Sequence, residues 1–215
     1  MDKRSLSAIH CIMMIICILT VSILIPFIWK GFYFMQIDSL EIHKYIALDT
    51  EVVKQIYANM IDYCLGFTSE FNIDPMPYSS SGYSHFNDVR KLVRFDMILA
   101  IMSSLILIHC GIKKCKKKVM IEKLAGHTPY FWSAVIVIVF DLLVVGMAWM
   151  NFDLAWSIFH KILFIGKTNW QFSMLTDPII IMLPGQFFLN CGLLIIGIQL
   201  IWSILLIVID LRKNK

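Results

Sequence analysis

Four apolar runs are each long enough to cross a lipid bilayer, at about residues 7–28, 95–112, 130–150 and 187–209. A transmembrane helix needs about 20 predominantly apolar residues to cross roughly 30 Å of hydrocarbon, and helices satisfy their own backbone polar groups there. The composition agrees, because hydrophobic residues make up 59% of the chain and charged residues only 16%. We therefore expect a single all-α membrane domain over residues 1–215, with four transmembrane helices.

The first run follows a short charged start, "MDKR", and in this respect is similar to a secretory signal peptide. No small-x-small cleavage motif comes after it, since the run ends in "PFIW" at residues 26–29. We expect this segment to be retained as a membrane anchor.

Six lysines gather in the loop between the second and third runs, at about residues 113–129: Lys113, Lys114, Lys116, Lys117, Lys118 and Lys123. Lys and Arg are enriched in the cytoplasmic loops of membrane proteins, so we expect this loop to be cytoplasmic. Basic residues also precede the first run and follow the fourth, which predicts that both termini are cytoplasmic. We interpret the lysines as an orientation signal that also attracts anionic lipid, rather than as a site for a specific partner.

The first segment expected on the outer side runs from about residue 31 to residue 94. Within it, "DTEVVKQIYANMIDYCLG" has apolar residues at helical spacing, with Asp49 or Thr50 as N-cap and Gly66 as terminator. Upstream, the alternation of polar and apolar residues over Ser39–His43 suits a strand. We expect a small cap of mixed structure between the first and second spans.

The second outer segment, at about residues 151–186, is rich in Trp and Phe and too apolar for a free loop. Indole and phenyl rings prefer the membrane interface. We therefore expect this segment to lie in the interface at the outer face.

Several classes of function are not indicated by the sequence. The six cysteines form no C-x-x-C pair that would suggest zinc or a redox dithiol, and no basic patch interleaved with aromatic residues indicates a nucleic-acid partner. The chain has no G-x-S-x-G nucleophile motif, and we interpret the serines of "YSSSGYS" as a flexible loop. Asp141, inside the third run, is expected to face the bundle interior as a packing or lipid-polar contact.

Histidine is the side chain best suited to proton transfer near neutral pH, and three of the six fall on the expected outer side: His43, His85 and His160. The others, His10, His109 and His127, fall in spans, at their ends or on the cytoplasmic side, where packing or anchoring is the expected role. His85 and His160 each lie beside aromatic residues, in "SHF" and "IFHKILF". These two are the candidates for chemistry.

Ser84 is a good N-cap for a helix that leads into the second span, which would place His85 in its first turn. Two opposing effects then act on the pKa of His85, because the helix N-terminus disfavours imidazolium and Asp88, three residues on, favours it. Either outcome leaves a residue able to act as a general base at pH 7, with Asp88 as its orienting partner. Two other uses of these groups stay open: a metal site formed with His160, and a purely structural role.

Two stretches carry a family resemblance, "SHFNDVRKL" at residues 84–92 and "FHKILFIGKTNWQFSMLTDPIIIMLPGQFF" at residues 159–188. The first contains a His-x-x-Asp-Val-Arg run, and the second contains Phe-His with Lys-Ile-Leu-Phe, followed by Gly166, Trp170, Thr176, Asp177 and Pro184. Together with the four-span layout, they resemble the lipoprotein intramolecular transacylase family of bacterial integral membrane proteins. The chain departs from the family pattern at Ser173, Met174 and Gly185, so no role is transferred to those positions.

The resemblance implies a substrate, a reaction and a location. The substrate would be a diacylglyceryl-modified lipoprotein with a free α-amine on its N-terminal cysteine. Its sn-2 acyl chain would move from glycerol to that amine, giving an N-acyl "lyso" lipoprotein without any cofactor. Membrane lipid would be the other partner, and the active site would face the outer leaflet of the bacterial cell membrane.

The resemblance also implies roles for residues. His85 would take the amine proton with Asp88 orienting it, and His160 would polarise the ester carbonyl, stabilise the oxyanion or return the proton, although the two histidines could exchange these roles. Arg90, Trp170 and Asp177 would support these groups or contact the substrate headgroup. Two alternatives stay open, a non-catalytic membrane subunit and a metal-dependent membrane lipid hydrolase.

Overall fold

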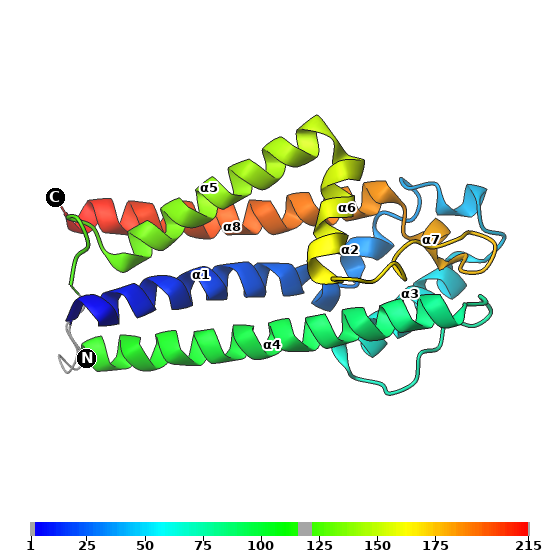
Figure 1. The fold of residues 1–215 in the computed structure, drawn as a ribbon, viewed down its shortest axis with the longest axis horizontal. Helices are drawn as coiled ribbons and strands as arrows, with labels where there is room; N and C mark the ends of the chain where they lie inside the picture. The colour runs from blue at the N-terminus through cyan, green and yellow to red at the C-terminus, as the bar shows by residue number, and fades with distance from the viewer. Residues whose placement is uncertain (1–2, 116–121, 215) are drawn as a thin grey trace. The chain divides into compact units, whose positions relative to one another are not determined.

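The computed structural model describes residues 3–115 and 122–214, which form helices joined by turns and short irregular segments (Figure 1). The elements in chain order are α1 (Lys3–Ile28), α2 (Gly31–Phe34), the 3-10 helix η1 (Ile42–Lys44), α3 (Thr50–Leu65), α4 (Ser80–Cys115), α5 (Pro129–Met150), α6 (Phe152–Leu163), α7 (Ile179–Met182) and α8 (Gly185–Lys213). Within the described residues there is no strand, only one isolated bridge between Leu124 and His127. The predicted all-α fold is confirmed.

Four helices, α1, α4, α5 and α8, are long and apolar enough to cross a membrane, and the four predicted runs lie within them. The largest difference between a predicted run and the observed helix is at the start of α4. This helix has 36 residues and is therefore about 54 Å long. This length exceeds the roughly 30 Å of hydrocarbon, so part of α4 lies outside it. The part before residue 95 carries Asp88, Arg90, Lys91 and Arg94, whose charges would be costly in lipid. The predicted loop at about 113–129 lies partly outside the described residues.

The contacts divide the chain into two compact units. One unit comprises residues 1–23, 96–151 and 195–215. Two side-chain hydrogen bonds link its segments: Gln199 Nε2 donates to Ser22 Oγ at 2.8 Å, and His127 Nδ1 donates to Asp210 Oδ2 at 2.6 Å. Asp141 is only 2% exposed, which confirms that it faces the interior of this bundle.

The second unit comprises residues 24–95 and 152–194 and contains every candidate site residue. The predicted amphipathic helix is confirmed as α3, with Asp49 at its N-cap and Gly66 ending it at φ 83°. The buried face of α3 presents Tyr57, whose ring stacks on Tyr33 at 3.9 Å between centroids. The Tyr33 hydroxyl donates to the carbonyl of Met182 at 2.9 Å, which ties α7 to this core.

The strand predicted over Ser39–His43 is wrong. Residues 36–41 form turns and η1 follows, with Glu41 in the left-handed region at φ 55°. Ile37 and Ile42 are both 1% exposed. Residues five positions apart lie on opposite faces of a strand, so only a turning backbone brings both side chains into one core.

Candidate functional site

The start of α4 is fixed by Asp177. The Ser79 backbone N–H donates to Asp177 Oδ1 at 2.7 Å, and the Ser79 hydroxyl donates to Oδ2 at 2.8 Å. Ser79 Oγ in turn accepts from the backbone N–H of Gly82 at 3.0 Å, as an N-cap does. The prediction that Ser84 caps the helix is therefore wrong, as is the flexible loop predicted for the serine stretch, because Ser80 already begins α4.

Gly82 permits the close approach of Asp177. A Cβ atom on Gly82 would lie 2.1 Å from Asp177 Oδ1, well inside any van der Waals distance. The early helix start places His85 sixth in α4, in the second turn rather than the first. The position of His85 thus depends on a carboxylate 98 residues further along the chain than Ser79.

His160 lies near the end of α6 with a defined tautomer. Its Nδ1 is 2.9 Å from the backbone carbonyl oxygen of Trp156, and because a carbonyl only accepts, Nδ1 carries the proton. In the neutral ring, Nε2 then has the free lone pair. Burial lowers the pKa of His160 below its ordinary value, although the bond to Trp156 acts in the opposite direction. The ring is therefore held as a neutral imidazole that can accept a proton at Nε2.

The two predicted catalytic histidines lie together. The centroids of the His85 and His160 rings are 6.1 Å apart with 30° between their planes. The residues are 6% and 5% exposed, respectively. His85 Nδ1 is buried and has no hydrogen-bond partner in the part of the chain that is described. Two buried imidazoles at this separation can contact neighbouring atoms of one reacting group.

Aromatic side chains enclose the two histidines. Phe164 lies 4.8 Å from the His85 ring, and Phe172 lies 5.3 Å from it, between centroids. Trp170 lies 4.8 Å from the His160 ring, with 30° between the planes. This apolar wall keeps bulk water away from the rings, which strengthens electrostatic interactions there.

Asp88 is buried beside the two histidines, but its carboxylate binds Lys167 and Asn169 rather than the predicted partner, His85. Lys167 Nζ donates to Asp88 Oδ1 at 2.6 Å, and Asn169 Nδ2 donates to Oδ2 at 3.0 Å. Both carboxylate oxygens are thus engaged by the segment after α6 rather than by His85. Sequence reasoning missed Lys167 and Asn169, although both lie in the "FIGKTNWQF" part of the stretch that carries the family resemblance.

The remaining predicted residues occupy separate places in this unit. Trp170 packs on His160, and its Nε1 donates to the carbonyl of Lys167 at 3.1 Å. Asp177 is 3% exposed and holds the start of α4. The guanidinium carbon of Arg90 lies 4.6 Å from the centroid of the Tyr63 ring, in a cation–π contact.

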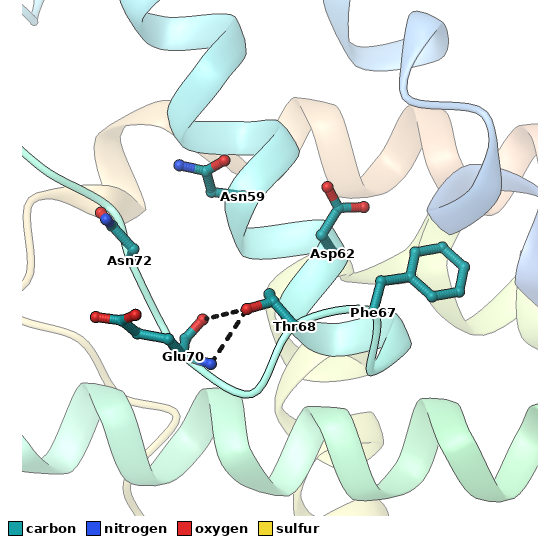
Figure 2. A pocket seen from close by; sticks show the side chains of 6 residues that line it. All are labelled: Asn59, Asp62, Phe67, Thr68, Glu70 and Asn72. Atoms are coloured by element: carbon teal, nitrogen blue, oxygen red, sulfur yellow. Dashed lines mark hydrogen bonds between the residues drawn. The ribbon is translucent and has the colours of Figure 1, made fainter.

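A cavity of about 390 Å³ opens beside the end of α3, lined by Asn59, Asp62, Phe67, Thr68, Glu70 and Asn72 (Figure 2). Neither histidine lines it. Five of its six lining residues are polar or charged, and Thr68 Oγ1 accepts from the backbone N–H of Glu70 at 3.2 Å. Because none of the predicted site residues lines this cavity, the paired histidines and not the cavity form the candidate site.

The lowered pKa of His160 predicts its charge state in solution. At pH 6.5 an ordinary histidine is about half protonated, whereas His160 is expected to be mostly neutral with its proton on Nδ1. Nitrogen NMR of protein with labelled histidines would measure the charge of the ring and the nitrogen that carries its proton. The His160 signal is assigned by its loss in His160→Gln. A His160 signal that titrates at or above pH 6.5 would contradict the expectation.

Since unfolding restores the ordinary pKa of His160, this residue also makes the folded state less stable as the pH falls below about 6.5.

Comparison with protein-family models gives a match over residues 8–188 to the model described as lipoprotein intramolecular transacylase Lit. Comparison with curated proteins gives no match. Among solved structures, the membrane integral lipoprotein intramolecular transacylase Lit from Bacillus cereus aligns with a TM-score of 0.87 and 24% identity, over 99% of this chain and 95% of that chain. Two histidine-substituted variants of that protein align with TM-scores of 0.78 and 0.80, at 24% and 23% identity, over 98% of this chain and 91% and 94% of theirs. These structures share the fold of the chain.

Proposed function

Because the chain belongs to the lipoprotein intramolecular transacylase family, we propose that it moves the sn-2 acyl chain of a diacylglyceryl-modified lipoprotein to the α-amine of that molecule's N-terminal cysteine. The chain is an acyltransferase and a multi-pass membrane protein. The observation that carries the proposed chemistry is the buried histidine pair, with 6.1 Å between ring centroids. We place this site at the outer leaflet of a bacterial cell membrane, with both termini cytoplasmic.

The proposed reaction needs a base and a group that stabilises negative charge. An α-amine has a pKa of about 7.7 to 8.0, so most of it is protonated at neutral pH and must lose one proton to water before it attacks. Its nitrogen then forms a bond to the ester carbonyl carbon, an oxyanion develops, and the nitrogen gives its second proton to the base. Collapse of this intermediate breaks the bond to the glycerol oxygen, which receives a proton. Ester and amine belong to one molecule, and holding them in attacking geometry can contribute about 7–11 kcal/mol.

We assign the base to His160. Its Nδ1–H donates to the Trp156 carbonyl, so the neutral ring has its lone pair on Nε2 and accepts a proton there. The same bond stabilises the imidazolium that forms, because the donor becomes more strongly polarised. The imidazolium then returns its proton to the leaving glycerol oxygen.

We assign the stabilisation of the oxyanion to His85. Its Nδ1 is buried without a partner among the described residues, which favours the tautomer with the proton on Nε2. An Nε2–H on this ring, whose centroid lies 6.1 Å from that of His160, would supply the donor that the oxyanion needs. In this proposal His160 accepts a proton and His85 donates a hydrogen bond, which refines the interchangeable roles considered from the sequence.

The other predicted residues support this pair in our proposal. Asp177 fixes the start of the helix that carries His85, and Trp170 restricts the orientation of the His160 ring. Asp88 is bonded at both oxygens to Lys167 and Asn169, which disfavours its use as a metal ligand with the two histidines. Arg90, placed over Tyr63, is proposed to contact the substrate headgroup from the edge of the site.

Product analysis tests the proposed reaction. Purified protein in liposomes is mixed with two synthetic diacylglyceryl lipopeptides, one carrying isotopic labels in both its peptide and its acyl chains. We expect N-acyl lyso products in which labelled peptide carries only labelled chains, because transfer is intramolecular, and no change in rate with a strong chelator. Free fatty acid would indicate a hydrolase, exchange of labels would indicate intermolecular transfer, and no product would favour a non-catalytic subunit.

A further inference from the structure

Two side chains of the segment after α6 bind the turn of α4 that presents His85. Lys167 Nζ donates to Asp88 Oδ1 at 2.6 Å, and Asn169 Nδ2 donates to Asp88 Oδ2 at 3.0 Å and to Ser84 Oγ at 3.4 Å. Ser84 and Asp88 lie four residues apart, on either side of His85 and on the same face of the helix. The two contacts therefore hold this turn at both of its ends.

The same segment is tied by its backbone to His160. The Phe164 N–H donates to the carbonyl of His160 at 2.8 Å, and the Lys167 N–H donates to the carbonyl of Phe164 at 2.9 Å. Between them Gly166 adopts φ 75°, a conformation that reverses the chain and favours glycine. Lys167 is thus placed at a fixed distance from the end of the helix that carries His160.

The geometry points to Lys167 as a positioning residue: its ion pair with Asp88 holds the His160 segment against the His85 helix and so sets the separation of the two rings. This inference rests on the proposed function, because only a reaction that uses both histidines depends on their separation. Lys167 also supports the aromatic wall, since its carbonyl accepts from Trp170 Nε1 at 3.1 Å.

Asp88 is buried, whereas the Lys167 side chain is 48% exposed, so the ion pair is half-buried. Replacing Lys167 leaves the buried Asp88 carboxylate without this partner and removes the side-chain ion pair between the two segments. Lys91 also lies near Asp88, at 3.7 Å from Oδ1, but its side chain is 68% exposed. Lys91 belongs to α4 itself and cannot link two segments, which makes it a matched control for charge alone.

Steady-state kinetics test this inference in proteoliposomes over a range of diacylglyceryl lipopeptide fractions. For Lys167→Met we expect kcat to fall about 10- to 100-fold, because small misplacements of reacting groups have effects of this size. KM should change by less than about threefold, since the lost interaction acts in the transition state. Lys167→Arg should keep most of the activity because a guanidinium also binds a carboxylate, and Lys91→Met should match the unsubstituted protein.

A double substitution keeps the inference testable if Lys167→Met also lowers stability. In an Asp88→Asn background, adding Lys167→Met should change kcat by less than about twofold, because the pair is already broken. Equal kcat values for Lys167→Met and Lys91→Met, or a full additional loss in the Asp88→Asn background, would overturn the inference. His160→Ala serves as the reference for the reaction itself. If His160→Ala is as active as the unsubstituted protein, the histidine assignment in the proposed function fails. If His160→Ala loses activity while Lys167→Met is fully active, this inference alone fails.

Discussion

Replacing His160 with alanine is expected to lower the rate of acyl transfer by about 10²- to 10⁴-fold, the range that a general base contributes. The substitution removes the Nε2 lone pair that the Nδ1–H bond to Trp156 makes available, so no group takes the proton from the attacking amine. Replacing His85 with alanine is expected to cost about 10²- to 10³-fold, as the loss of one oxyanion donor does. Mass spectrometry of the lipopeptide N-terminus would measure lyso product in both cases.

Glutamine at the same positions separates the two roles. An amide can donate a hydrogen bond to an oxyanion but cannot take up a proton at neutral pH, so His85→Gln should retain more activity than His160→Gln. His43→Ala is the matched control, because the His43 side chain is 38% exposed and contacts Asp38 and Thr50 rather than the pair. Full production of lyso product by both alanine variants would exclude the histidine assignment.

Replacing Gly82 with alanine is expected to destabilise the protein by about 1–3 kcal/mol, as overpacking in a closely packed site does. The added Cβ would lie 2.1 Å from Asp177 Oδ1 and 2.9 Å from its Cγ, so the carboxylate must leave Ser79. Helix α4 would then lose the acceptor that fixes its start, and His85 would shift relative to His160. We expect a lower midpoint of thermal unfolding in detergent and a lower rate of acyl transfer.

Gly111→Ala provides the comparison within the same helix. A Cβ on Gly111 would meet nothing within 4 Å, and alanine is the better helix former, so its midpoint should be unchanged or higher. Equal midpoints for the two variants would show that the contact between Gly82 and Asp177 does not constrain α4.

The transmembrane helices and α3 could be predicted because their signals are local. Apolar runs of sufficient length and a 3.6-residue period are read from neighbouring residues, as is the termination of α3 at Gly66. The strand predicted over Ser39–His43 failed because a short alternation does not reveal that Ile37 and Ile42 share one core. Whether Ile37 and Ile42 are buried together depends on side chains from other segments that pack around them, and a short alternation does not contain these.

The candidate site could be predicted in part. The positions of His85 and His160 in segments predicted to be outer, together with the family resemblance, were sufficient to select both residues as candidates. The helix start at Ser80 was missed because its determinant, Asp177, is 98 residues away from Ser79. The assignment of Asp88 to His85 followed from their spacing on one helix, whereas Lys167 reaches Asp88 from 79 residues away. Contacts of this separation are not encoded in any local pattern.

The bond between Asp177 and Ser79 also means that the start of α4 depends on a residue that is synthesised much later. A ribosome makes Ser79 and His85 long before Asp177, so a nascent chain that ends before residue 177 lacks the acceptor for the start of α4. His160 and Lys167 are made in the same late stretch. The paired histidines can therefore come together only after residue 160 has been made, and we expect a chain that ends before that residue to lack acyl-transfer activity.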